Sequence, residues 1–258
     1  MINDQIKQLT HGLRVLGIHN SFEARANEAQ AKSLSHLEFL RLVLEDESLA
    51  RKQRVAKALL TRAKFRSAVD LEDWDQSFDR GITKTKLRDL ASQGFLLSNE
   101  NLIILGRTGE GKSHLAMAVG RRLCTDNIST LFIPVNFLFE EVMAAKAAGK
   151  YLAYIRKLTA VPVVILDDFG LRNYTHEEAN VLVDLLEDRH RKGSVIVTSQ
   201  ADPKGWGKLF EDPLIAEAIV NRLEHPSQRI NLKGGSYREK LQMAAQNKKK
   251  VVAEKLLI

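Results

Sequence analysis

Hydrophobic and polar positions follow two different periods along the chain. In the N-terminal part, apolar residues recur every three or four positions up to Gly17, which is the period of an amphipathic helix. Ser35 and Glu38 have the spacing of a capping box, so a second helix is predicted to begin there and to continue toward Phe65. These patterns predict a small all-helical N-terminal domain over residues 1–69.

Beyond this part, short apolar runs rich in β-branched residues alternate with helical patterns. An acidic, turn-rich segment over residues 70–81 is predicted to be the linker between the two parts. Thr175 and Glu178 predict the start of one later helix, and Asp212 predicts the start of another. The alternation predicts an α/β fold with a parallel sheet in a second domain, residues 70–258, which ends in a short basic tail. The predicted strands are residues 101–105, 130–135, 161–168, 194–200 and 229–232.

Composition restricts the partners that such a chain can have. Lys and Arg number 39 against 32 Asp and Glu, which gives the 258 residues a net charge of +7 and favours binding to polyanions. Cysteine occurs once, so neither an internal disulfide nor a thiolate-rich metal site is expected. Neither the N-terminus nor any later stretch has the apolar run of a signal peptide or a membrane span. We therefore expect a cytoplasmic protein that does not contact a membrane.

A phosphate-binding loop follows the first predicted strand of the sheet. Its sequence matches the pattern G-x-x-x-x-G-K-[ST] and lies directly between an apolar strand and a helical run. Glycines let backbone amides turn toward phosphate oxygens, while Lys112 is expected to bridge the β- and γ-phosphates of ATP and Ser113 to bind Mg²⁺. Arg107 and Glu110 are expected to have exposed side chains, and the alternative for the whole loop is a glycine-rich turn whose lysine faces solvent. The predicted nucleotide-binding residues are Gly106, Arg107, Thr108, Gly109, Glu110, Gly111, Lys112 and Ser113.

Two carboxylates end the third predicted strand. Asp167 and Asp168 follow a continuous apolar run, residues 163–166, which is the pattern of a strand buried on both faces. The carboxyl ends of parallel strands meet at the ligand-binding edge of a sheet, so both acids are expected beside the phosphate loop. Asp167 is predicted to hold Mg²⁺ through water, and Asp168 to polarise the water that attacks the γ-phosphate. The alternative is that both carboxylates only cap the turn after the strand.

Two further polar sites are candidates for the reaction. The next strand ends in Thr-Ser-Gln, where Gln200 or Thr198 could orient the attacking water, unless the cluster only terminates the strand. Arg222 lies near the end of the helix that begins after Asp212. In a ring or spiral of subunits, an arginine at such a place can reach the γ-phosphate bound by a neighbour. Its alternative role is to pair with carbonyl groups at the end of its own helix.

Residues 51–66 carry seven basic side chains and no acidic one. Along a helix, these side chains are expected to contact the phosphates of duplex DNA without reading its sequence. Few aromatic residues are available to stack on bases, so binding to duplexes is favoured over binding to single strands. The alternative is a solvated amphipathic face whose apolar residues pack inward. The predicted DNA-binding residues are Arg51, Lys52, Arg54, Lys57, Arg62, Lys64 and Arg66.

Taken in their order, these motifs resemble the IstB-like family of insertion-sequence ATP-binding proteins, which are AAA+ relatives of the DnaC helicase loader. The resemblance covers nearly the whole chain and is carried by NLIILGRTGEGKSHLAMAVG, VVILDDFG, IVTSQ, WGKLFEDP with NRLEH, and INLKGGSYR. Asp168 stands where the family often has glutamate, and Gln200 where it often has asparagine. The resemblance implies an AAA+ P-loop fold with a truncated lid, in which Arg238 is a candidate substitute for a sensor-2 arginine.

The resemblance also implies a function. It points to an ATPase that assembles as a homo-oligomer on duplex DNA and assists a cognate transposase in the transposition of an insertion sequence. A DnaC-like replicative helicase loader is the nearest alternative, because the local motifs do not distinguish the two. A small-molecule kinase would need an acceptor pocket and a lid with arginines, for which the tail after residue 232 leaves little room. A scaffold in which ATP only switches DNA binding, with Asp168 a poor catalyst, is the third alternative.

Overall fold

The chain forms two compact units, Met1–Leu59 and Leu60–Ile258. The boundary expected between residues 69 and 70 falls later in the chain than this division. Ala63 is fully buried and Phe65 packs against the hydrophobic core of the second unit, which explains why the second unit begins earlier than the charge pattern predicts. The computed structural model describes residues 2–190, 192–240, 242 and 243, and the basic run expected at 248–250 lies outside them.

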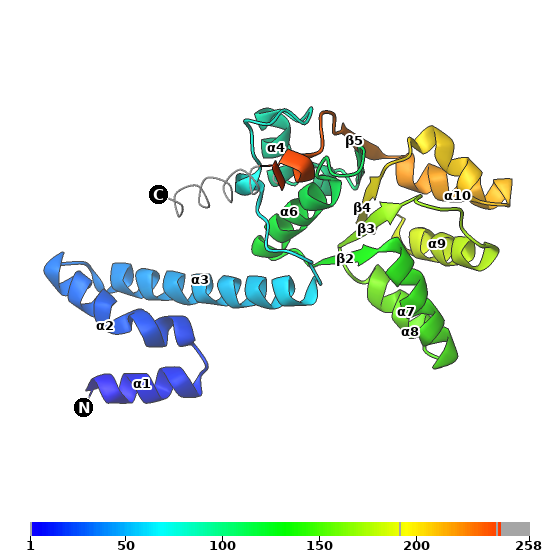
Figure 1. The fold of residues 1–258 in the computed structure, drawn as a ribbon. Helices are drawn as coiled ribbons and strands as arrows, with labels where there is room; N and C mark the ends of the chain where they lie inside the picture. The colour runs from blue at the N-terminus through cyan, green and yellow to red at the C-terminus, as the bar shows by residue number, and fades with distance from the viewer. Residues whose placement is uncertain (1, 191, 241, 244–258) are drawn as a thin grey trace, which may run out of the picture. The chain divides into compact units, whose positions relative to one another are not determined.

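The described part of the N-terminal unit is helical (Figure 1). The capping box is present as predicted, because the Glu38 carboxylate accepts hydrogen bonds of 2.8 Å from both the N–H and the hydroxyl of Ser35. The prediction that Gly17 ends the first helix is wrong, because Gly17 lies in the first turn of the second helix. A Cβ at Gly17 would lie 2.5 Å from the Cα of Glu47, so this glycine allows two helices to approach closely. The helices are α1 (Ile2–Gly12), α2 (Leu16–Ala31) and α3 (His36–Arg62), of which α3 continues past the division between the units.

In the second unit, a five-stranded parallel sheet lies between two layers of helices (Figure 1). The strand order is β2-β3-β4-β1-β5, and every neighbouring pair is parallel. All five predicted strands are present. Their bounds are β1 (Asn101–Leu105), β2 (Thr130–Pro134), β3 (Val163–Phe169), β4 (Ser194–Ser199) and β5 (Ser227–Asn231).

Alternate residues of each central strand enter two separate hydrophobic cores. In β1, Leu102 and Ile104 pack with α6, while Ile103 and Leu105 face the core that contains α7, α9 and α10. Such strands are buried on both faces, which is why their sequences read as continuous apolar runs. The helices of this unit are α4 (Lys84–Ala91), α5 (Gly94–Leu97), α6 (Lys112–Thr125), α7 (Val135–Ala147), α8 (Tyr151–Thr159), α9 (His176–Arg189) and α10 (Pro213–Glu224).

Two helix starts predicted from capping residues are confirmed. Thr175 and Glu178 form a reciprocal capping box at α9, and the Asp212 carboxylate accepts hydrogen bonds from the first turn of α10. The segment predicted as a linker, residues 70–81, instead packs on the sheet unit through the buried Trp74. None of the helices in the described part of the chain combines the length and apolar character needed to span a membrane.

Candidate nucleotide-binding site

A polar cleft of about 570 Å³ lies where the carboxyl ends of β1, β3 and β4 meet. Loops and helix N-termini converge at this edge of a parallel sheet, which is why ligands bind there. The structure brings most of the predicted nucleotide-site residues together around this cleft. Its lining includes Thr108, Gly109, Gly111, Lys112, Ser113, Asp167, Asp168 and Gln200.

The phosphate loop connects β1 to α6 through backbone conformations that favour glycine. Gly109 and Gly111 have φ angles of 86° and 101°, in the left-handed region. Arg107 is exposed as expected, but Glu110 is only 4% exposed. The Glu110 carboxylate accepts a hydrogen bond of 2.6 Å from the backbone N–H of Arg107. The expectation of an exposed Glu110 is therefore wrong, because this side chain braces the loop from within.

Lys112 begins α6 and is buried against the cleft. Its side chain is 6% exposed, and its ammonium group donates a hydrogen bond of 3.0 Å to the carbonyl of Arg107. Burial lowers the pKa of Lys112, and the negative charges of Asp168 and Asp167 oppose that shift. The alternative of a lysine that faces solvent is therefore excluded. A buried cation at a helix N-terminus creates a site for an anion such as a phosphate.

Strand β3 is irregular at its two acids. Its register with β4 shifts between Leu166 and Phe169, and Asp168 has a φ of 60°. Thr198 of β4 holds both acids, because its hydroxyl donates a bond of 2.6 Å to Asp167 and accepts one of 3.0 Å from the N–H of Asp168. Gln200, in contrast, lines the cleft, and its amide oxygen accepts a bond of 2.9 Å from the Thr108 hydroxyl. Of the two candidates at the end of β4, Gln200 is thus the one with a side chain in the cleft.

The electrostatic environment of the cleft affects the Asp168 carboxylate. Burial and the charge of Asp167 raise the pKa of Asp168, while the positive charges of Lys112 and Arg66 oppose the rise. A carboxylate with a raised pKa is a stronger base, which is the property needed to take a proton from water. Ser113 and Asp167 supply hydroxyl and carboxylate oxygens, the ligands that Mg²⁺ prefers. The residues present therefore fit a nucleotide with bound Mg²⁺.

Residues outside the predicted site also lie against the phosphate loop. Arg80 is 2% exposed, and its guanidinium carbon lies 3.3 Å from the centre of the Trp74 ring and 4.4 Å from that of Tyr237. The backbone N–H of Tyr237 donates a bond of 3.0 Å to Gly109. This stack joins segments that are far apart in the sequence, so no local pattern indicates it. Arg238, the candidate sensor-2 substitute, also lines the cleft.

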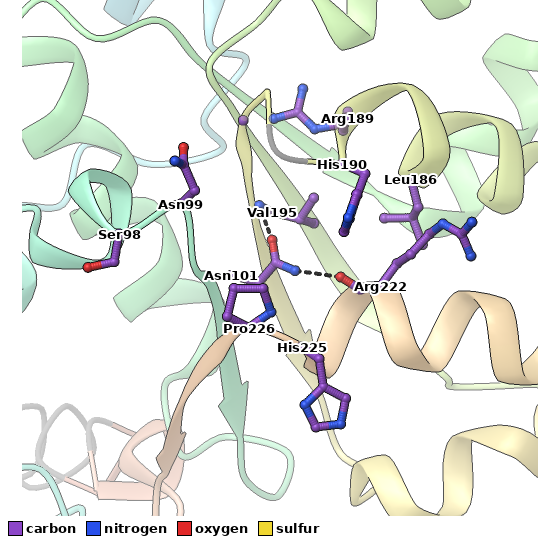
Figure 2. A pocket seen from close by; sticks show the side chains of 11 residues that line it. Ser98, Asn99, Asn101, Leu186, Arg189, His190, Val195, Arg222, His225 and Pro226 are labelled. Atoms are coloured by element: carbon purple, nitrogen blue, oxygen red, sulfur yellow. Dashed lines mark hydrogen bonds between the residues drawn. The ribbon is translucent and has the colours of Figure 1, made fainter.

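Arg222 lies at the other edge of the sheet (Figure 2). It occupies the last turn of α10, where its carbonyl accepts a bond of 2.7 Å from the side chain of Asn101, the first residue of β1. The five residues of β1 therefore separate it from the phosphate loop, by roughly 16 Å at 3.3 Å per residue. Its guanidinium donates to the carbonyl of Ala218 in its own helix, the kind of bond expected as its alternative role, and it also pairs with Glu187 of α9. Arg222 is thus not part of the cleft in its own chain.

The basic residues predicted to bind DNA are divided between the two units and are partly engaged within the chain. Arg51 and Arg54 both pair with the buried carboxylate of Glu47, at 2.7 and 3.2 Å. Lys64 pairs with Glu141 at 2.7 Å. The residues in the N-terminal unit are Arg51, Lys52, Arg54 and Lys57, and those in the second unit are Arg62, Lys64 and Arg66.

Comparison with known proteins shows to which family the chain belongs. Residues 8–245 match the IstB-like ATP-binding proteins. The chain belongs to this family. The insertion sequence IS21 ATP-binding protein of Pseudomonas aeruginosa is 34% identical to it over 236 residues, which are 92% of this chain and 89% of that protein. The resemblance drawn from the sequence motifs is thereby confirmed.

Solved structures show that the IstB-like chain has the AAA+ P-loop fold. DnaI superposes with a TM-score of 0.55 at 20% identity, and the match covers 69% of this chain and 94% of the DnaI chain. The DnaC helicase loader superposes with a TM-score of 0.51 at 18% identity, and the match covers 64% of this chain and 97% of the DnaC chain. The α/β fold class with a parallel five-stranded sheet is therefore confirmed.

Proposed function

We propose that this IstB-like protein is a DNA-stimulated ATPase that assembles on duplex DNA and assists the transposase of an insertion sequence. The observation that carries the proposal is the cleft in which Lys112, Ser113, Asp167 and Asp168 meet. The nucleotide and the biological setting follow from the relative in Pseudomonas aeruginosa, which is named as an insertion-sequence ATP-binding protein.

Each residue of the cleft has a separate part in hydrolysis. Lys112 and the N–H groups at the start of α6 bind the β- and γ-phosphates and offset their charge. Ser113 and Asp167 hold Mg²⁺, which when bound withdraws negative charge from the phosphates. Asp168 takes the proton from water as the water oxygen bonds to the γ-phosphorus and ADP leaves, and Gln200 orients that water.

Assembly completes the site. Arg222 lies at the opposite edge of the sheet from its own phosphate loop, so the γ-phosphate on which it acts belongs to a neighbouring subunit in a ring or spiral. Release from Glu187 frees its guanidinium for that contact. Basic residues of α3, among them Lys52 and Arg62, contact the phosphates of the duplex. Hydrolysis then depends on both assembly and DNA.

Particle mass tests the assembly. Light scattering compares the wild type with Lys112→Ala, each with and without ATP and a long duplex at moderate salt. We expect only the wild type to grow, and only when ATP and DNA are both present. Growth of both proteins alike, or of neither, would refute ATP-driven assembly. Stimulation of the transposase by the wild type but not by Lys112→Ala then separates this function from that of a helicase loader.

Mixing of variants tests the action of Arg222 in trans. We expect Arg222→Ala to bind ATP but to hydrolyse it at least about 10³-fold more slowly, the effect of losing an arginine that stabilises the transition state. Adding Lys112→Ala subunits, which keep Arg222, should restore hydrolysis. Arg229→Ala is the matched control, because Arg229 pairs with Glu224 on the surface. Full hydrolysis by monomeric Arg222→Ala would exclude the role in trans.

A further inference from the structure

Arg66 has different surroundings from the other predicted DNA-binding residues. It lines the same cleft as Lys112, Asp167 and Asp168. It is exposed, and it forms no ion pair with any residue that the structure describes. Its side chain is therefore available to a ligand in that cleft.

The segment around Arg66 is fixed to the sheet unit. The Ala63 carbonyl accepts a bond of 2.8 Å from the N–H of Phe132, so the segment follows the outer edge of β2. The Phe65 ring lies 6.3 Å from that of Phe132, and the Ser67 hydroxyl contacts the sulfur of Met117 at 3.8 Å. Contacts on both sides of Arg66 thus determine where its backbone lies. Strand β2 is the neighbour of β3, which carries the two acids of the cleft.

Two aromatic rings and the charge of the cleft act on the Arg66 side chain. Its guanidinium carbon is 5.8 Å from the ring centres of both Phe132 and Phe137, within the range of a cation–π contact. Asp167 and Asp168 line the same cleft, so their negative charges also act on this guanidinium. The terminal phosphate of a bound nucleotide belongs on this side, between the lysine of the loop and the acids of β3.

We propose that Arg66 binds the terminal phosphate of the ATP held by its own chain and does not contact DNA. This inference rests on the proposed nucleotide site. A guanidinium can make two parallel hydrogen bonds to phosphate oxygens. Because ATP has the terminal phosphate and ADP does not, this contact strengthens the binding of ATP only. Arg66 then distinguishes ATP from ADP, and it follows α3 closely in the sequence, so the segment after the basic helix senses which nucleotide is bound.

Nucleotide preference tests this role in the full-length chain. Affinities for the β,γ-methylene analogue of ATP and for ADP are measured with Mg²⁺ for the wild type, Arg66→Ala and Arg66→Lys. We expect Arg66→Ala to bind the ATP analogue about tenfold more weakly while ADP changes less than about twofold, because only ATP has the phosphate in question. Arg66→Lys should lie between the two. Arg156→Ala removes the same charge from an exposed position on α8 and should change neither affinity.

Binding to a duplex without nucleotide tests the other half of the inference. We expect the salt dependence of DNA binding by Arg66→Ala to match that of the wild type, whereas loss of a phosphate contact would reduce its slope by about 0.9. A reduced slope, or equal changes in the affinities for ATP and ADP, overturns the inference. If the wild type binds both nucleotides but DNA does not accelerate its ATP hydrolysis, the proposed function is refuted. The preference for ATP over ADP still decides the role of Arg66 in that case.

Discussion

In the C-terminal unit the central strands are buried on both faces, whereas the helices of the N-terminal unit bury few apolar side chains. Residues 163–166 of β3 are fully inaccessible to solvent. Among the described residues of the N-terminal unit, the buried apolar ones are Phe22, Val43 and Ala56, and Leu13 is 71% exposed. Burial of apolar area is the main favourable contribution to folding, so the two units cannot owe their stability to it equally.

The N-terminal unit depends instead on charged side chains between α2 and α3. Glu47 is 6% exposed and accepts bonds from the N–H groups of Gly17 and Ile18, at 2.6 and 3.3 Å. Arg25 donates two bonds of 2.8 Å to Asp46. The difference between the units has a functional meaning. The sheet unit is a scaffold that keeps the nucleotide site in place, while the helical unit is held by charged groups that respond to pH and salt.

The largest expected effect is on the rate of hydrolysis and comes from Asp168→Asn. This substitution also tests whether the sheet unit keeps its fold when a charge in the cleft is lost. We expect the rate of phosphate release to fall about 10²- to 10⁴-fold, the usual contribution of a general base. Thermal stability should not fall, because the raised pKa of Asp168 means that burial and the charge of Asp167 disfavour its ionised form. Asp89→Asn, an exposed change in α4, is the control and should keep the wild-type rate. Undiminished hydrolysis by Asp168→Asn would show that another group is the base.

The next effect is on stability and should be confined to the helical unit. Glu47→Ala leaves the backbone N–H groups of Gly17 and Ile18 without their acceptor, and a buried donor left without a partner costs about 1–3 kcal/mol. Hydrogen–deuterium exchange of the full chain should then be faster in α2 and α3 and unchanged in the sheet. Glu45→Ala is the matched control, because Glu45 pairs with Arg41 on the surface and such pairs contribute at most about 1 kcal/mol. Equal effects of the two substitutions would contradict the comparison.

The same difference explains how much of the structure could be predicted. The strands, the phosphate loop and the caps at Thr175 and Asp212 depend on neighbouring residues, so local patterns were sufficient for them. The prediction for Gly17 is wrong because the role of this glycine depends on α3, a helix that follows later in the sequence. The bulge that places Asp168 depends on Thr198 of another strand, and the placement of Arg66 depends on the bond between Ala63 and Phe132 of β2. Contacts of this kind leave no period or motif in the sequence.

The smallest effect is a difference in acid sensitivity, which tests the role of charge in the helical unit. Hydrogen bonds from Arg25 lower the pKa of Asp46 to about 2 from its ordinary value of 3.8. Burial alone would raise the pKa of Glu47, but the bonds from Arg51 and from the backbone of α2 outweigh burial and lower it.

A lowered carboxylate pKa stabilises the folded state at every pH above the ordinary value, and this contribution is lost as the pH falls through the folded value. Acidification below about pH 4 should therefore accelerate exchange in α2 and α3 before it does so in the sheet. In the cleft the sign is reversed, because protonation of Asp168 relieves the cost of its burial. Asp46→Asn should make the helical unit less stable at neutral pH and less sensitive to acid. Simultaneous loss of protection in both units would show that they do not differ in the way that their contacts indicate.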